Sequence, residues 1–291
     1  MPKLISNSLI PALLFVLVRL IGPVTCSGAD EFISDAGIKA DFETKLSALL
    51  QDGGVPTATV TLKQLHEEKK SSVSLPVVTP EGNVSTGHRR ALSSTLVLGH
   101  LYLCDTCDKK HANLAGGVII SPDGLALTNY HVLDFKEAIV FGAMTADGNI
   151  YAIDEVLAAS KKDDIALIRL KSAKELPFVT LQETLETGDD VFVISHPDGY
   201  FYTFTKGYLS RKYLDQKEQI PKLQITADFA RGSSGSGIFN SRNELVGIAA
   251  STNSIYYEPT GENPGNFQMV IRSGVPVSSI MKLFAPKAPR D

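Results

Sequence analysis

The segment Gly232-Ser233-Ser234-Gly235-Ser236-Gly237 combines residue types that suit nucleophilic catalysis. A serine hydroxyl is a weak nucleophile, and it needs a neighbouring base and hydrogen-bond donors aimed at the developing oxyanion. Glycine two positions before the serine lets the backbone turn so that two amide N–H groups converge. Only Ser234 has glycine at that position, so we expect Ser234 as nucleophile and the N–H groups of Gly232 and Ser234 as the oxyanion hole. A Gly/Ser-rich turn without chemistry is the alternative for this segment alone.

His131 is the candidate general base. It follows an apolar run, Leu125–Thr128, that predicts a buried strand, and it is one of six histidines in the chain. A single histidine after a strand is more often structural, so the position alone is weak support. The main competitor is His196, which precedes Pro197 in a turn at a predicted strand end, where we expect a surface role.

Asp164 is the candidate for the residue that orients the histidine. It stands at the head of the apolar strand 165–170, where a carboxylate can be half-buried and accept the N–H of an imidazole. The alternative is a solvated turn after Lys161 and Lys162, which fits Asp163 better than Asp164. The gaps of 33 and 70 residues between His131, Asp164 and Ser234 predict the first two in one barrel and the serine in a second.

The elements that must position these residues are short strands. From about residue 91 onward, apolar or alternating runs recur between turn signals, which predicts about a dozen strands of an all-β barrel pair. A terminal helix is expected at 277–284. Before the strands, helical spacing predicts a helix over 34–50, and residues 71–90 have the composition of a linker.

The N-terminus predicts export. Lys3 precedes an apolar core at 10–18 that suits a signal peptide and is shorter than a membrane span of about 20 residues. We expect cleavage near residue 26 and a secreted or periplasmic location. Retention as an anchor and lipid modification of Cys26 stay open. The net charge of −4 and pI near 5.9 exclude a basic nucleic-acid footprint.

Cys104, Cys107 and His111 form a second group of reactive side chains. Two Cys and one His suit part of a zinc site, but a fourth ligand is not evident. The sequence favours a local disulfide or two plain thiols over a metal.

Together, three segments resemble the triad motifs of trypsin-like serine peptidases, above all the bacterial Deg/HtrA-like branch: Thr128-Asn129-Tyr130-His131-Val132, Asp164-Ile165-Ala166-Leu167 and Gly232-Ser233-Ser234-Gly235. Further similarity lies in the segments 117–124, 196–199, 205–207 and 245–248. The resemblance implies two six-stranded antiparallel β-barrels with a C-terminal helix, and peptide-bond hydrolysis through an acyl-enzyme without a cofactor. It divides the chain into a signal peptide (1–26), a helix and linker segment (27–92) and a protease domain (93–291), with barrels at about 93–175 and 176–285.

Two departures from the family pattern change what the resemblance implies. Digestive relatives carry an acid directly before the nucleophile that pairs with a new N-terminal amine. Ser233 stands there instead, so we expect no activation by cleavage. Deg-type proteins usually add a PDZ domain, and we expect none here because the chain ends soon after the predicted terminal helix.

Three residues near the predicted nucleophile bear on substrate preference. Asp228 lies six residues before Ser234, where an acid can select Arg or Lys, and Ala250 and Thr252 lie where a pocket wall is expected. A structural pairing of Asp228 with Arg231 is the favoured alternative. We expect protein or peptide substrates and no nucleic acid. The competing function is an inactive homologue that binds peptides in the same cleft.

Overall fold

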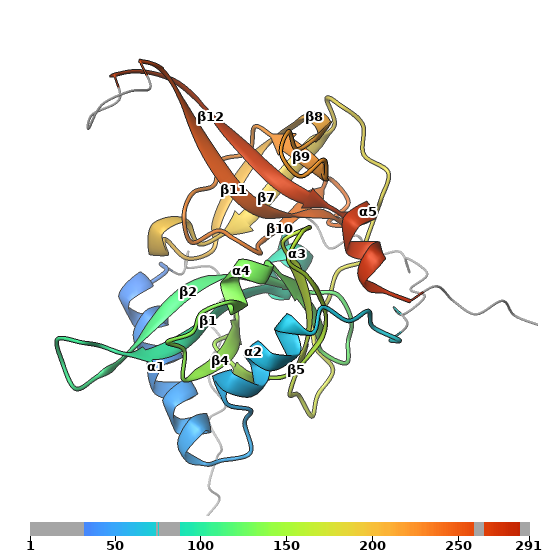
Figure 1. Ribbon diagram of the computed structural model, residues 1–291. Helices are drawn as coiled ribbons and strands as arrows, with labels where there is room; N and C mark the ends of the chain where they lie inside the picture. The colour runs from blue at the N-terminus through green and yellow to red at the C-terminus, as the bar shows by residue number, and fades with distance from the viewer. Residues whose placement is uncertain (1–31, 74, 76–87, 259–264, 286–291) are drawn as a thin grey trace, which may run out of the picture. The chain divides into compact units, whose positions relative to one another are not determined.

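Twelve strands organise the part of the chain that the structure describes, in two groups of six (Figure 1). The computed structural model describes residues 32–73, 75, 88–258 and 265–285. The predicted signal peptide with Cys26, and most of the predicted linker, lie outside these residues. From Ser34 onward the described residues belong to one compact unit. Within the described residues, no helix combines the length and apolar character that crossing a bilayer requires.

The first group of strands closes into an antiparallel barrel in the order β1-β2-β3-β6-β5-β4. Closure comes from β1 pairing with β4, as in the partners Leu98 and Ala143. Barrel closure leaves no unpaired strand edge. The strands are β1 (Thr95–Leu103), β2 (Lys110–Ile119), β3 (Leu125–Thr128), β4 (Val140–Thr145), β5 (Ile150–Ser160) and β6 (Ile165–Leu170).

The second group closes in the order β10-β11-β12-β9-β8-β7. Its strands are β7 (Asp190–Ser195), β8 (Thr203–Leu214), β9 (Pro221–Ile225), β10 (Gly237–Asn240), β11 (Leu245–Glu258) and β12 (Gly265–Pro276). The short 3₁₀ turn η1 (Pro197–Gly199) follows β7. The predicted all-β class with two six-stranded antiparallel barrels is therefore confirmed.

The predicted terminal helix is present in two short parts. The chain forms α5 (Val277–Ile280) and then the 3₁₀ turn η2 (Met281–Leu283). Apolar side chains of this segment, such as Val277 and Ile280, join a core that contains Val118 of the first barrel and Phe239 of the second. One continuous apolar core thus joins the two barrels.

The helical segment before the barrels packs on the first of them. Helix α1 (Asp35–Gln51) begins at Ser34, whose hydroxyl accepts the N–H of Gly37 at 3.2 Å. Its Phe42 and Leu46 are fully buried against apolar side chains that include Val97 and Met144. The predicted helix over 34–50 is confirmed, and Figure 1 shows it in blue beside the green strands.

Three further helices were not expected from the sequence. They are α2 (Ala58–His66), α3 (Arg89–Ser94) and α4 (Tyr130–Leu133). Helix α2 buries Ala58 and Leu65 in the same core as strands of the first barrel. The helices from the segment 27–92 therefore form part of the folded unit.

Candidate active site

His131 and Asp164 lie side by side at one end of the first barrel. His131 sits in α4, directly after β3, and Asp164 stands in the turn before β6. Strands β3 and β6 pair antiparallel, with Thr128 opposite Ala166. This register brings the end of β3 next to the start of β6, so two residues 33 positions apart in sequence meet.

The contact between them is a bidentate hydrogen bond. The Nδ1 atom of His131 lies 2.9 Å from Oδ1 and 3.0 Å from Oδ2 of Asp164. The backbone N–H of His131 donates to Oδ1 at 3.1 Å. A carboxylate can only accept, so Nδ1 carries the proton and Nε2 is left with its lone pair. The imidazole is thus held in the tautomer that a general base requires.

Asp164 adopts a left-handed backbone conformation with φ of 59°. Aspartate tolerates this region better than most residues because its short polar side chain bonds locally. The side-chain amide of buried Asn129 donates to the Asp164 carbonyl at 2.8 Å and fixes the turn from the strand side. Asn129 is therefore a positioning residue for the carboxylate.

The Ser234 loop connects β9 to β10 in the second barrel, and two glycines shape it. Gly232 has φ of 90° and Gly235 has φ of 82°. A Cβ atom on Gly232 would lie 2.6 Å from the His196 carbonyl oxygen, and one on Gly235 would lie 2.3 Å from the Gly116 carbonyl oxygen. Both positions therefore require glycine for conformation and for space.

Two amide N–H groups of this loop are free to bind an anion. The N–H groups of Gly232 and Ser234 donate to no residue within the described part of the chain. By contrast, the neighbouring Gly235 N–H donates to the Ala249 carbonyl at 2.9 Å, and Ser236 N–H donates to the Ser233 carbonyl at 3.1 Å. The loop thus leaves unpaired the two donors that the sequence predicts for an oxyanion hole.

Ser234, His131 and Gly232 line one cavity of about 640 Å³. Ser233 and Ser236 are fully buried, which leaves Ser234 as the serine of this loop that meets the cavity. The Ser234 hydroxyl makes no hydrogen bond with any residue that the structure describes. Nucleophile–base contacts in serine hydrolases are often looser before a substrate is bound, so shared access to the cavity is the relevant observation.

Helix α1 contributes to the same cavity, through its first turn. Asp35, Ala36 and Lys39 line it together with residues of both barrels. The Asp35 carboxylate accepts the backbone N–H of Phe201 at 2.9 Å, which joins the start of α1 to the loop before β8. The sequence did not assign any role to this helix.

His100 of β1 also lines the cavity and is 2% exposed. Its ring stacks on Phe135 with centroids 4.2 Å apart. Burial lowers the pKa of His100 to about 4, so the ring is neutral at neutral pH. Its Nε2 atom has no partner among the described residues.

His196 is fully buried, and the expected surface role was wrong. Its Nε2 lies 3.0 Å from the Leu96 carbonyl, and its Nδ1 accepts the N–H of Tyr202 at 3.1 Å. Burial lowers its pKa to about 4, which keeps the ring neutral. Because Leu96 belongs to the first barrel and the His196 carbonyl abuts Gly232, this histidine holds the serine loop against the first barrel. In the sequence, the only signal of a special role for His196 was its position directly before the Pro197 turn.

The residues suggested for a specificity pocket lie elsewhere. Asp228, Ala250 and Thr252 are not among the residues that line the 640 Å³ cavity. The Asp228 carboxylate pairs with Arg272 at 2.8 Å and is 74% exposed. The suggested pairing with Arg231 was wrong, since Arg231 pairs with Asp198 at 3.2 Å. A pocket built on these three residues stays a prediction.

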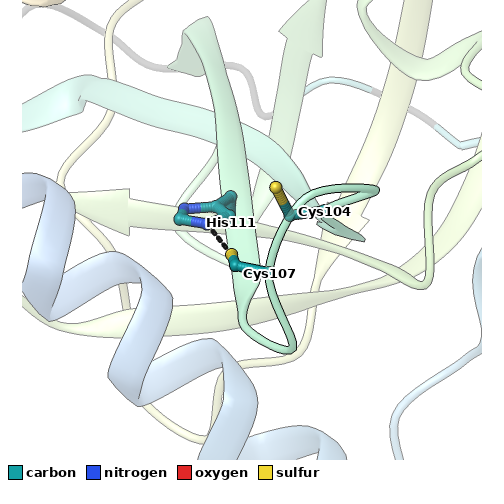
Figure 2. A group of neighbouring side chains, drawn as sticks. All are labelled: Cys104, Cys107 and His111. Atoms are coloured by element: carbon teal, nitrogen blue, oxygen red, sulfur yellow. Dashed lines mark hydrogen bonds between the residues drawn. The ribbon is translucent and has the colours of Figure 1, made fainter.

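Cys104, Cys107 and His111 gather at the turn between β1 and β2 (Figure 2). Both cysteines are free thiols in the structure. The Cys107 sulfur lies 3.2 Å from Nε2 of His111.

Comparison with known proteins shows which proteins this chain resembles. The trypsin-like peptidase domain family matches residues 115–248. A probable periplasmic serine endoprotease DegP-like of Buchnera aphidicola subsp. Schizaphis graminum is 35% identical over 164 residues, covering 54% of this chain and 33% of that protein. A protein of the same description from Pseudomonas putida (strain GB-1) is 33% identical over 176 residues. The match covers 58% of this chain and 35% of that protein. The chain therefore spans about a third of the length of these curated relatives.

Among solved structures, the HtrA-type protease AlgW with decapeptide superimposes with a TM-score of 0.57 at 20% identity. The match covers 69% of this chain and 66% of that one. At this identity the likeness concerns the fold. Residues 115–248 therefore match the trypsin-like peptidase domain family, the two-barrel fold is similar to that of an HtrA-type protease, and DegP-like serine endoproteases are homologous to part of this chain.

Proposed function

We propose that this protein is a serine endopeptidase that uses Ser234 as nucleophile, His131 as general base and Asp164 to orient the base. One observation carries the proposal. The hydrogen-bonded His131–Asp164 pair opens onto the same cavity as Ser234 and Gly232, whose amide N–H groups have no partner within the described residues. Nucleophile, oriented base and oxyanion donors are the parts that acyl transfer needs.

In the acylation step, Nε2 of His131 takes the hydroxyl proton as the Ser234 oxygen bonds to the scissile carbonyl carbon. The carbonyl π electrons move to oxygen, and the N–H groups of Gly232 and Ser234 stabilise that oxyanion. The C–N bond then breaks, and the leaving amine takes the proton from His131. The products are an acyl-enzyme on Ser234 and a free amine.

In the deacylation step, His131 takes a proton from water as the water oxygen attacks the ester carbonyl. Collapse of the second tetrahedral intermediate returns the proton to Ser234 and releases the acid. Asp164 stays ionised throughout and stabilises the imidazolium. The bidentate contact at 2.9 and 3.0 Å suits this role, because it resists rotation of the ring.

The substrates we propose are polypeptides outside the cytoplasm. Two observations support this class. The curated relatives are named as periplasmic endoproteases, and the solved neighbour is titled with a decapeptide. The predicted signal peptide at 1–26 would direct the segment 27–92 and the protease domain 93–291 to that compartment.

We further propose that the enzyme needs no cleavage of its chain for activation. Ser233, in the place of the acid that digestive relatives use, is fully buried and neutral. Its hydroxyl donates to the Ser195 hydroxyl at 3.1 Å and accepts the Ala230 N–H at 3.4 Å. The position is thus already partnered without a new N-terminal amine. A protein with a blocked, extended N-terminus should be active, and activity that appears only after trimming would contradict this.

Labelling with a fluorophosphonate tests the main proposal. The wild-type protein should be modified at Ser234, and Ser234→Ala should abolish labelling while its circular dichroism spectrum stays unchanged. Ser72→Ala, at an exposed serine outside the cavity, is the matched control and should label like the wild type. A folded wild-type protein that resists labelling and cleaves no peptide would instead favour the inactive, peptide-binding homologue.

Cleavage of a peptide library then defines the substrate preference. If Asp228, Ala250 and Thr252 form the primary pocket, the wild type should prefer Arg or Lys, and Asp228→Ala should lose that preference. If the exposed Asp228 serves only its pairing with Arg272, the preference should stay unchanged in this variant.

A further inference from the structure

The turn between β1 and β2 brings together three side chains that bind transition metals. Cys104 and Cys107 stand in the turn itself, and His111 is in β2, with its side chain directed back toward them (Figure 2). The two sulfur atoms and one ring nitrogen all lie within 4.8 Å of one another. The proposed peptidase chemistry uses none of these residues.

The spacing of these atoms fits one ion in their midst. A tetrahedral zinc with bonds of about 2.3 Å to sulfur and about 2.0 Å to nitrogen separates its ligand atoms by roughly 3.5 to 3.8 Å. The Cys107 sulfur and His111 Nε2 are 3.2 Å apart, so they need to separate by only a few tenths of an ångström. The turn lies at the protein surface, where such a movement meets little resistance.

Glu43 of α1 favours the tautomer of His111 that a metal requires. Its Oε1 atom lies 3.9 Å from Nδ1 of His111 and accepts the backbone N–H of the next residue, Ala112, at 3.0 Å. A carboxylate beside Nδ1 favours the proton there and leaves the lone pair on Nε2, the atom that faces Cys107. Metal-binding histidines commonly donate their other ring N–H to a carboxylate, and here the 3.9 Å separation would have to shorten by about 1 Å for that hydrogen bond to form.

We propose that Cys104, Cys107 and His111 bind one Zn²⁺ ion, with water as the fourth ligand. Binding releases the two thiol protons to solvent, and the two thiolates neutralise the charge of the ion. Two sulfurs and one imidazole match the ligand preference of zinc over magnesium or calcium. Within the described residues no fourth Cys, His or carboxylate joins the group, which leaves that position to water.

The site would act on structure rather than on the bond-breaking step. It joins both strands of one hairpin, and through Glu43 it is in contact with α1, which packs on the same barrel. The neighbouring β2 residues Asn113, Leu114 and Ala115 line the candidate active-site cavity, as does the first turn of α1. Bound zinc would therefore stabilise the positions of β2 and α1, two elements that line the cavity.

Metal titration of the full chain tests the proposal. The Ser234→Ala background prevents self-cleavage and makes the result independent of the proposed peptidase activity. The reduced, chelator-treated protein, without a histidine tag, should bind one equivalent of Zn²⁺ in competition with a chromophoric chelator. Replacement by Co²⁺ should give thiolate-to-metal charge-transfer bands and the visible bands of a tetrahedral site.

Variants assign the ligands. Cys107→Ser and His111→Ala should abolish the charge-transfer bands and the single equivalent, whereas His66→Ala, at a histidine outside the group, should change neither. Glu43→Gln should keep the stoichiometry and the bands but weaken Zn²⁺ binding about 10- to 100-fold. Unchanged stoichiometry and bands together with weaker Zn²⁺ affinity would identify Glu43 as a positioning residue rather than a merely structural one.

Three results would overturn the zinc site. One is a fully reduced protein that binds no equivalent of Zn²⁺. This applies also to protein that was isolated with a Cys104–Cys107 disulfide and then reduced before the titration. The second is a cobalt complex without thiolate bands. The third is full binding by Cys107→Ser. Hydrogen exchange over 103–112 gives a second readout. It should slow on addition of Zn²⁺ in the Ser234→Ala protein and its His66→Ala variant, but not in the Cys107→Ser or His111→Ala variants.

Discussion

The backbone N–H of Gly116, in the first barrel, donates a 2.8 Å hydrogen bond to the carbonyl of Ser234, in the loop of the second. The Gly116 carbonyl in turn accepts the hydroxyl of Thr128, three residues before His131, at 2.9 Å. The proposed nucleophile and base, which belong to different barrels, are thus tied to one strand position. Gly116 touches neither reacting group, so we expect it to affect catalysis through the position of the Ser234 loop.

Gly116→Ala should therefore impair catalysis. A Cβ atom there would lie 2.0 Å from the Ser236 hydroxyl oxygen and 2.8 Å from its backbone nitrogen, so the serine loop must move. A displacement on the order of 1 Å can lower kcat/KM about 100-fold, and overpacking should cost about 1–3 kcal/mol of stability. Peptide hydrolysis and urea unfolding of the variant measure the two effects.

Gly53→Ala is the control for this substitution. Its φ of 73° makes alanine unfavourable by about 1–2 kcal/mol, but nothing lies within 4 Å of the added carbon. It should lose some stability and no activity. Equal activities of the two alanine variants would refute a role for Gly116 in placing Ser234.

Asp164→Asn should lower kcat by about 10⁴-fold if the carboxylate fixes the tautomer of His131. Asparagine tolerates the left-handed backbone at this position, so the fold should persist. Steady-state kinetics and circular dichroism separate the two effects. Asp154→Asn, at an exposed carboxylate of β5, should leave kcat unchanged. A loss below about 10-fold in Asp164→Asn would contradict its assigned role.

Stability should fall between pH 6.5 and pH 4 because His100 and His196 are buried and neutral. Burial lowers the pKa of each from 6.5 to about 4. In this window the unfolded chain binds protons that the folded protein excludes, so the free energy of unfolding decreases as pH falls. Above pH 6.5 both states are neutral, and the stability is fully present. Each group contributes up to about 3 kcal/mol across the window.

Urea unfolding at several pH values measures this dependence. His100→Phe should reduce the slope between pH 6.5 and 4, since phenylalanine keeps the stacking on Phe135 and cannot be protonated. Carboxylates with lowered pKa values contribute mainly at the acidic end of this window, where the unfolded chain begins to bind their protons. An example is Asp134, whose pKa the His66 hydrogen bond lowers from 3.8. A flat profile from pH 7 to 4.5 would exclude the histidine effect.

Phe42→Ala should destabilise the protein by about 3–5 kcal/mol, because this ring is fully buried between α1 and the first barrel. Urea unfolding should show a single transition that shifts as a whole. Leu103→Ala, at a side chain that is 63% exposed, should change stability by less than about 0.5 kcal/mol. An unchanged midpoint for Phe42→Ala would mean that α1 does not belong to the cooperative unit.

Lys39→Glu should change which peptides are cleaved. Lys39 lines the cavity and has no ion-pair partner in the described part of the chain. A single exposed charge pair is worth up to about 1 kcal/mol, so kcat/KM for acidic peptides should fall up to about 5-fold and that for basic peptides should rise. Lys63→Glu, on α2 and outside the cavity lining, is the matched control. Equal shifts in both variants would indicate a general effect of net charge.

The strands and the proposed triad were predictable from the sequence because both depend on local signals. Short apolar runs between turn residues mark the strands. His131 follows β3, Asp164 directly precedes β6, and Ser234 lies in the loop before β10. Pairing of β3 with β6 then places Asp164 beside His131. The local signals did not predict the order of the strands within each barrel; only the resemblance to a known family did.

Other features depend on contacts between distant segments, which leave no local pattern. His196 looks like a surface turn residue in the sequence, yet it is buried and its ring bonds to the Leu96 carbonyl, 100 positions earlier. Asp228 has a nearby arginine at Arg231, but it pairs with Arg272 on β12. Helix α2 escaped prediction because its nine residues carry only a few apolar positions, which find their partners on the first barrel.

The order of strands around each barrel has a practical consequence for producing this protein. The family match begins at residue 115, inside β2, and ends at residue 248, inside β11. A fragment cut to those limits would lack β1 and β12, each of which separates two other strands in its ring. Both barrels would open, and their unpaired edge strands would promote pairing between chains and aggregation in solution. Expression should therefore start ahead of α1 and extend beyond α5.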